Sequence, residues 1–356
     1  IIYRVATSKN LPDDHVLRRH PDWISETYKG AKAEEANVYI DPGVPGVIDH
    51  TAQVVADLAG RYELDGLHFD RIRYPGKDWG YNKIALARYR KMTGHLLRPK
   101  PDDEDWAAFR RGQINAMLMR LNTVAKSHQP SIRVSAATIA FDASPDDFRQ
   151  SQAFASVYQN WLAWGRTRWL DVNCLMDYKR DRVANQARDY RRWMDFLAAN
   201  QGHAVPVIGQ GSFLNPAAAS LRQIDLALRD PKLSGVCLFS YAQMSSEARQ
   251  GDLLMKNLRY RYFRPNVKPP QRHAFDQTRY GWAAGQIAGD GVDRLAVTLS
   301  TQPRRQAWTD GSGFFTFNRV PPGKYRVTVW KDREKIAETS IAVTAGRASG
   351  IRLTAD

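Results

Sequence analysis

The chain has 356 residues, of which 43% are hydrophobic and 25% are charged, an ordinary composition for a globular protein. No apolar run approaches the roughly 18 residues that a membrane-spanning helix needs, so no membrane span is expected in this segment. A formal net charge of +15 favours acidic partners, such as anionic cell-wall polymers, acidic polysaccharides or nucleic acids. Nucleic acid is disfavoured, because Lys and Arg are spread over the whole chain and no nucleic-acid motif accompanies them.

Strand-like and helix-like segments alternate along the first 241 residues. Apolar residues recur at helical spacing over 47–61 and 105–127, and residues 144–147, Ser-Pro-Asp-Asp, are typical of a helix start in which the acids are capping groups. Alternation of this kind predicts a parallel sheet with helices packed on it. The expected strands are 2–7, 65–70, 132–139, 170–177, 205–210 and 235–241.

The segment 65–75, DGLHFDRIRYP, carries the strongest functional signal. Side chains alternate along a strand, so His68 and Asp70 share one face with a glycine, while the residues between them are apolar. A strand that ends on a carboxylate in this way suits a barrel strand whose inner end opens into a site. A salt bridge from Asp70 that only fixes the loop is the structural alternative. The loop that follows supplies Arg71, Arg73 and Tyr74.

This segment is similar to the fourth barrel strand of the bacterial glycosyl hydrolase-like family 10, and four further segments resemble family motifs in the same order. The resemblance covers residues 1–262 and implies a (β/α)8 TIM-type barrel that acts on glycans outside the cytoplasm. One branch of the family cleaves peptidoglycan strands that have lost their stem peptides. The four segments are HPDWI at 20–24, YIDPGVPGV at 39–47, WLDVNCLMDYKRD at 169–181 and LSGVCLFSY at 233–241.

Only six of the eight strands of such a barrel are legible. The opening residues, IIYRVAT, correspond in the family to the end of the third strand. An open six-stranded sheet would leave two unpaired edges. We therefore expect the chain to be an excerpt of a longer polypeptide that supplies two further strand–helix units.

The composition changes after the barrel-like part. Residues 263–280 are rich in Pro, Lys and Arg and predict a linker. From 281 to 356, short alternating runs between Gly, Pro and Asp turns predict a small β-sandwich. The run 309–330 is similar to carboxypeptidase regulatory-like, transthyretin-like domains, which usually act as structural attachments. Trp308 and Trp330 are candidates for sugar stacking, although burial in the sandwich core is the commoner fate of Trp.

Glycosidic cleavage generally needs two carboxyl groups, one protonated and one ionised. Asp70 and Asp177 are the best pair, because each ends a predicted strand and the family order places them on strands four and six, across the barrel mouth. The arginines after Asp70 should keep it charged, whereas burial would make Asp177 a general acid. Lys179 and Arg180 oppose that role for Asp177, so reversed roles or a third acid remain open. The candidates for a third acid are Asp41, Asp142 and Glu247, and Glu63 is disfavoured.

Several polar and aromatic residues near strand ends are expected to contact substrate. His68 and Asn173 face either the substrate or the core, and at least one of the tyrosines is expected to be rim packing. Aromatic faces with hydroxyl groups suit sugar binding. The expected contacts are His68, Arg71, Arg73, Tyr74, Asn173, Tyr178, Lys179 and Tyr241.

Cys174 and Cys237 lie in apolar runs and are predicted to be small buried residues. No zinc or calcium spacing occurs, and the sequence predicts neither a metal nor a cofactor.

Together, the strand-end carboxylates and the family resemblance predict a glycoside hydrolase that acts on a bacterial cell-wall or related polysaccharide. The alternative is a barrel without catalysis that serves as a glycan-binding or envelope scaffold.

Overall fold

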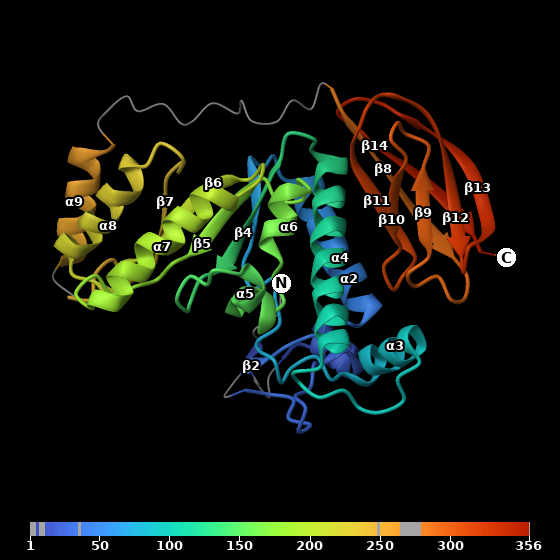
Figure 1. The fold of residues 1–356 in the computed structure, drawn as a ribbon, viewed down its shortest axis with the longest axis horizontal. Helices are drawn as coiled ribbons and strands as arrows, with labels where there is room; N and C mark the ends of the chain where they lie inside the picture. The colour runs from blue at the N-terminus through green and yellow to red at the C-terminus, as the bar shows by residue number, and fades with distance from the viewer. Residues whose placement is uncertain (1–4, 7–10, 35–36, 248–249, 264–278, 356) are drawn as a thin grey trace. The chain divides into compact units, whose positions relative to one another are not determined.

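The computed structural model describes residues 5–6, 11–34, 37–247, 250–263 and 279–355 (Figure 1). Most of the predicted linker at 263–280 lies outside the described residues. The chain forms two compact units. Unit 1 comprises residues 1–67, 71–132 and 275–356, and unit 2 comprises residues 68–70 and 133–274.

A five-stranded sheet carries the barrel-like part of the chain, in the order β3-β4-β5-β6-β7. Neighbouring strands from β4 to β7 pair in parallel, as the alternation of strands and helices predicts. Five of the six expected strands are confirmed, with ends that differ by at most two residues. These strands are β3 (Gly66–Phe69), β4 (Arg133–Ile139), β5 (Val172–Met176), β6 (Val205–Gly211) and β7 (Val236–Phe239).

The sixth expected strand, at 2–7, is described only as the two-residue strand β1 (Val5–Ala6). It pairs antiparallel with β2 (Asn37–Val38) and is not part of the five-stranded sheet. The expectation that this segment is a barrel strand is therefore wrong for the two residues that the structure describes.

The register of the sheet gives it two different faces. Asn173, Leu175 and Ile208 share one side and are buried, and we call this side the buried face. On the other side Cys174 is half-buried and Cys237 and Phe239 are exposed, whereas Ala137 and Met176 are buried, and we call this side the open face. Solvent therefore reaches this side of the sheet only at some positions, among them the edge strand β7.

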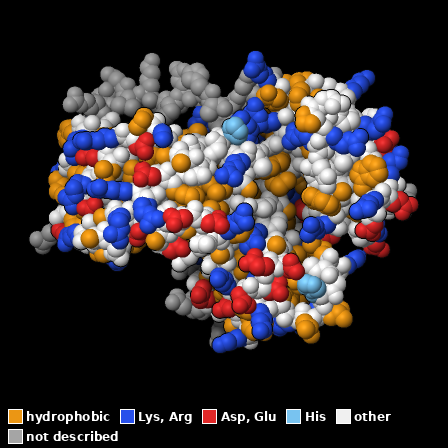
Figure 2. Space-filling view, viewed as in Figure 1, with side chains coloured by type: hydrophobic (Ala, Val, Ile, Leu, Met, Phe, Trp, Pro, Cys, Tyr) orange, Lys and Arg blue, Asp and Glu red, His pale blue; other side chains and the backbone are white. Residues whose placement is uncertain are grey.

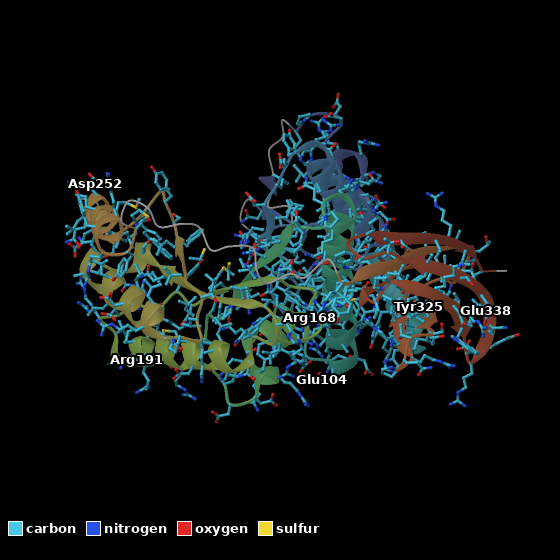
Figure 3. All side chains as sticks on the ribbon, turned by 90° about the horizontal axis from the view of Figure 1, so that it is seen from above. Glu104, Arg168, Arg191, Asp252, Tyr325 and Glu338 are labelled. Carbon is cyan, nitrogen blue, oxygen red and sulfur yellow. The ribbon has the colours of Figure 1, made fainter. Side chains whose placement is uncertain are left out.

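The helices of unit 2 follow the strands in chain order: α5 (Gln152–Ala155), α6 (Trp161–Arg166), α7 (Ala184–Asn200), α8 (Ala217–Arg229) and α9 (Gly251–Arg261). On α7, Tyr190 and Trp193 are buried whereas Arg191 is exposed (Figure 3). No helix starts with Ser144 as its cap, but the predicted capping role is confirmed for Asp147. Asp147 accepts from Arg149 N to cap the 3-10 helix η2 (Phe148–Gln150), and Ser151 then caps α5.

Unit 1 contains the helices α1 (Val16–Arg19), α2 (Pro45–Arg61), α3 (Lys83–Thr93) and α4 (Glu104–His128), with the 3-10 helix η1 (Pro21–Trp23). The two predicted helices at 47–61 and 105–127 are confirmed as α2 and α4. Pro45 opens α2, and Asp103 caps α4 by accepting from Trp106 N. No helix of the described residues is both long and apolar enough to cross a membrane.

The predicted β-sandwich is confirmed and belongs to unit 1. Its sheets have the orders β10-β9-β12-β13 and β11-β8-β14, around a core that includes Phe315, Phe317 and Val329. The sandwich packs on α4, where Thr123 Oγ1 lies 3.0 Å from Thr316 Oγ1. Its strands are β8 (Gly281–Ala288), β9 (Ala296–Leu299), β10 (Arg305–Trp308), β11 (Phe314–Val320), β12 (Gly323–Lys331), β13 (Glu334–Val343) and β14 (Ala348–Thr354).

Basic side chains are scattered over the surface that Figure 2 shows. This matches the even spread of Lys and Arg along the sequence. The positive field of the protein therefore comes from many separate side chains.

Candidate active site

Asp70 and His68 occupy the open face at the end of β3. Both side chains are exposed, and His68 Nδ1 lies 2.9 Å from Ser135 Oγ on the adjacent strand β4. Partial burial lowers the pKa of His68. The charge of Asp70 acts in the opposite direction and raises the pKa of His68, but its effect is the smaller one. An imidazole that is neutral near pH 7 therefore stands beside a carboxylate that solvent can reach.

Asp177 has the opposite surroundings. It directly follows β5, and its side chain is 0% exposed. Burial raises the pKa of Asp177 well above its ordinary value, although Lys179 Nζ at 3.5 Å from Oδ1 acts to lower it. Burial thus favours the protonated form of Asp177 and closes its side chain off from solvent, whereas Asp70 is exposed.

Lys179 and Asn173 are held by the fold. Lys179 is buried, and its Nζ donates to the carbonyls of Ala140 at 2.5 Å and Phe141 at 3.0 Å, so it fixes the loop after β4. Asn173 Oδ1 accepts from Thr138 Oγ1, which ties β5 to β4 on the buried face. Both residues were expected to contact substrate, but in this structure their polar atoms form buried hydrogen bonds within the protein.

An aromatic cluster occupies the strand ends of β5 to β7. Tyr178 stacks on Phe239, with ring centres 5.5 Å apart and an interplanar angle of 17°, and Phe213 meets both rings edge-on. Phe239 is 52% exposed and Tyr241 is 86% exposed. The sequence-based reasoning missed Phe213 and Phe239, although the run FSY at the end of a predicted strand was the available signal.

The residues of the loop after β3 belong to unit 1. Arg71 has a positive φ of 54°, and Arg73 N donates to Arg71 O at 2.8 Å, so the chain turns sharply here. Tyr74 is fully buried, and its hydroxyl donates to Asp41 Oδ1 at 3.0 Å. Tyr74 is therefore a packing residue, unlike Tyr178 and Tyr241.

The three candidates for a third acid have different environments. Asp41 is fully buried and accepts from Ser25 Oγ, Gly43 N and the Tyr74 hydroxyl, and burial raises its pKa against these bonds. Asp142 is half-buried after β4 and accepts from Gln152 N at 3.2 Å. Glu247 pairs with Arg182 at 3.1 Å. Asp142 therefore combines partial exposure with a place beyond the strand next to β3.

The two cysteines meet on the open face as free thiols. The prediction that both are buried is wrong: Cys237, on the edge strand β7, is exposed, and Cys174 is only half-buried. A hydrogen bond from Cys174 lowers the pKa of Cys237 to about 7, against its partial burial. No group of three or more His, Cys, Asp and Glu that could hold a metal ion occurs among the described residues.

The fold combines an α/β part, with polar groups at the ends of parallel strands, and a β-sandwich that follows it in the chain. A family model for the glycosyl hydrolase-like 10 family matches residues 4–208, and one for the carboxypeptidase regulatory-like domain matches residues 285–356. The first match covers more than half of the chain, so the chain belongs to the glycosyl hydrolase-like 10 family.

Two relatives and one solved structure are similar to this chain. Glycosyl hydrolase DigH of Escherichia coli (strain K12) is 26% identical over 249 residues, which is 63% of this chain and 52% of DigH. Glycosyl hydrolase YngK of Bacillus subtilis (strain 168) is 26% identical over 135 residues, which is 37% of this chain and 24% of YngK. The PgaB (BpsB) glycoside hydrolase domain from Bordetella bronchiseptica aligns with a TM-score of 0.48 and 13% identity, over 70% of this chain and 68% of that one. The chain thus spans about half the length of DigH.

Proposed function

We propose that this chain contributes the catalytic site of a glycoside hydrolase that acts outside the cytoplasm on a bacterial cell-wall or related polysaccharide. Peptidoglycan glycan strands are one such substrate. The observation that carries the proposal is Asp70, an exposed carboxylate at the end of a parallel strand, beside His68, in a chain of this family. The positive net charge supports an anionic polymer as the partner.

Asp70 is the reacting carboxylate in this proposal, as nucleophile or as stabiliser of the sugar cation. Asp177 is the proposed second acid, because burial raises its pKa and so favours the protonated form that a general acid needs. The Asp177 side chain is buried, so a substrate reaches it only if the residues that cover it move. Asp142, beyond the adjacent strand, is the solvent-accessible alternative.

The open face also offers surfaces for sugar rings. The exposed rings of Phe239 and Tyr241 present flat apolar faces, and Tyr178 supports Phe239 from behind. Stacking of this kind suits the apolar faces of pyranose rings. We propose His68, Tyr178 and Tyr241 of unit 2 as polar or aromatic contacts of the substrate. For Arg71 and Arg73 the same proposal rests on their place in the sequence directly after Asp70.

The test measures release of new reducing ends from purified glycan strands. Asp70→Asn should lower turnover by about a hundredfold or more, because one of the two carboxyl groups is removed. Asp65→Asn, at the other end of the same strand, is the matched control and should leave turnover unchanged. Asp177→Asn and Asp142→Asn then identify the second acid. Glycan binding without turnover in the unmutated chain would instead support the scaffold alternative.

A further inference from the structure

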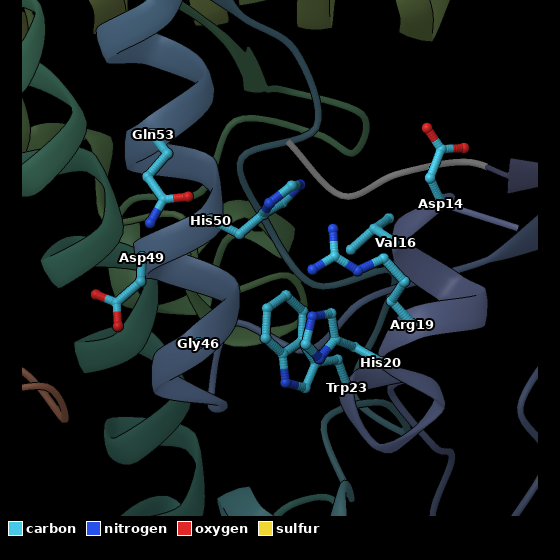
Figure 4. Close-up of a pocket in the computed structure, with 9 residues that line it drawn as sticks. All are labelled: Asp14, Val16, Arg19, His20, Trp23, Gly46, Asp49, His50 and Gln53. Atoms are coloured by element: carbon cyan, nitrogen blue, oxygen red, sulfur yellow. The ribbon is translucent and has the colours of Figure 1, made fainter.

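A cavity of about 360 Å3 lies in unit 1 between the segment of α1 and η1 and the first turns of α2 (Figure 4). None of the strand-end residues discussed above lines it. Its volume suits a single sugar ring, since small-molecule sites begin at about 300 Å3. The lining residues are Asp14, Val16, Arg19, His20, Trp23, Gly46, Asp49, His50 and Gln53.

Three basic side chains converge in this cavity. Figure 4 shows the Arg19 guanidinium turned toward His50, with His20 close below. Burial lowers the pKa of His50, and the nearby His20 and Arg19 lower it further. Because Arg19 disfavours a positive charge on His50, an anion bound between them would relieve that repulsion.

The two acids of the lining do not provide that anion. Asp49 points away from His50 (Figure 4), and its Oδ1 lies 2.5 Å from Arg120 Nη1 on α4, so its charge is already paired. Asp14 is exposed, and its carboxylate is turned away from Arg19 (Figure 4). Both acids thus line the cavity with their carboxylates turned away from Arg19 and His50 (Figure 4).

One wall of the cavity is aromatic and rigidly placed. His20 stacks on Trp23 with ring centres 3.8 Å apart and an interplanar angle of 9°. A Cβ atom on Gly46 would lie 2.6 Å from Trp23 Cζ2, so α2 approaches the indole this closely only with glycine at that position. An inorganic anion needs only the basic groups, whereas an organic ring also makes use of the aromatic wall and the volume.

We propose that this cavity binds a carboxylate-bearing sugar unit, with Arg19 and His50 as contacts of the carboxylate and the His20–Trp23 pair as the wall for the ring. This inference rests on the proposed function, because it takes the ligand to be part of a glycan. It goes beyond that function by naming acidic sugars as the class that the protein recognises.

The first experiment titrates the full chain with D-glucuronate and with D-glucose and follows binding by NMR. We expect a dissociation constant for glucuronate in the millimolar range, as for a single small ligand, and at least tenfold weaker binding of glucose. Arg19→Gln should weaken glucuronate binding about tenfold, because a charge-assisted hydrogen bond is lost. The matched control is Arg18→Gln. Arg18 directly precedes Arg19 on α1, pairs with Asp13 and does not line the cavity.

The second experiment follows the pH dependence of that binding. The charged or titratable groups in the lining around His50 are Arg19, His20 and Asp14 from the α1–η1 side and Asp49 from α2, which pairs with Arg120 of α4. Because the pKa of His50 is lowered, protonation and anion binding should support each other below neutrality. Glucuronate binding should therefore strengthen several-fold from about pH 7.5 to about pH 5.5, and His50→Gln should reduce that gain.

Three results would overturn the inference: equal binding of glucose, inorganic phosphate binding as tightly as glucuronate, or unchanged affinity in Arg19→Gln with an unchanged melting curve. Asp70→Asn separates this inference from the proposed function. That variant should lose turnover and keep glucuronate binding. Turnover without glucuronate binding contradicts only the acidic-sugar site, and binding without turnover contradicts only the hydrolase.

Discussion

Asp70 and Asp177 show how strongly surroundings alter one side chain. Both follow a strand, but Asp70 is exposed beside His68, whereas the Asp177 side chain is fully buried. The difference arises after the strand ends, where the chain at Asp177 turns and its amide donates to Leu175 O at 2.8 Å. Sequence position alone therefore left their roles open.

Asp177→Asn should change how stability depends on pH. The folded state holds a proton on Asp177 above the ordinary pKa of about 3.9, so it binds more protons than the unfolded state. The resulting stability is complete below about pH 4 and is lost as pH rises toward the folded pKa, by at most about 1.4 kcal/mol per pH unit. The asparagine variant should lack this slope in urea unfolding between pH 4 and pH 8.

The alternative is an ionised Asp177 that pairs with Lys179. In that case the asparagine variant would lose about 3–5 kcal/mol at pH 8, because a buried cation would remain without its partner. Such a loss, with the pH slope unchanged, would contradict a protonated Asp177.

Cys237 should react as a moderately acidic thiol. Its hydrogen bond from Cys174 favours the thiolate, and the rate of alkylation by iodoacetamide should rise with a midpoint near pH 7. Cys174→Ala removes that bond and should move the midpoint toward about 8.5, the value of an ordinary cysteine. A midpoint already above 8 in the unmutated protein would show that the two thiols do not interact.

At the level of elements, α4 connects the sandwich to the rest of unit 1. Arg120 on α4 contacts Asp310 at 3.3 Å and Ser312 Oγ at 2.7 Å, and it lies over the Phe314 ring. Asp310 also accepts from the backbone of the turn that opens β11. A turn that the sequence predicts is thus also the docking point of the helix.

Arg120→Met should destabilise the protein by about 3 kcal/mol or more, because Asp310 would stay buried without its counter-charge. Arg326→Met is the matched control, since Arg326 pairs at 3.8 Å with Glu338 on the exposed side of the sandwich. Exposed pairs of this kind contribute about 0–1 kcal/mol. Urea unfolding of both variants measures the difference, and similar losses would show that the Arg120 contact is not buried in solution.

At the scale of the whole molecule, the sandwich was expected to be a structural attachment, and it packs against the helices of unit 1. Arg88 on α3 donates to Asp293 Oδ2 at 2.8 Å, which adds a second contact to that of Arg120. Candidate acids for catalysis all precede the sandwich in sequence. Removal of the sandwich should therefore lower the stability of the protein and leave the rate of glycan cleavage unchanged.

A chain that ends after residue 263 should melt at a lower temperature than the full chain, because α3 and α4 lose their partners in the sandwich. Below its melting temperature it should keep the turnover that the full chain shows on a short soluble glycan. Calorimetry and the reducing-end assay test both parts. An unchanged melting temperature would show that the sandwich does not stabilise the helices.

The sequence by itself determined the alternation of strands and helices, the seven short strands of the sandwich and the family. These are local properties, because the periods of two and 3.6 residues and the turn residues lie within single segments. The ends of β3 to β7 and the helices α2 and α4 were predictable for this reason.

Only the tertiary structure decided which polar groups face solvent. Asn173, Lys179 and Tyr74 are used by buried hydrogen bonds to partners 33 to 39 residues away, and their sequence neighbours do not reveal those partners. The cavity beside Trp23 likewise depends on how closely α2 approaches η1 at Gly46. Such contacts arise between segments that are distant in sequence, so they appear only once the chain has folded.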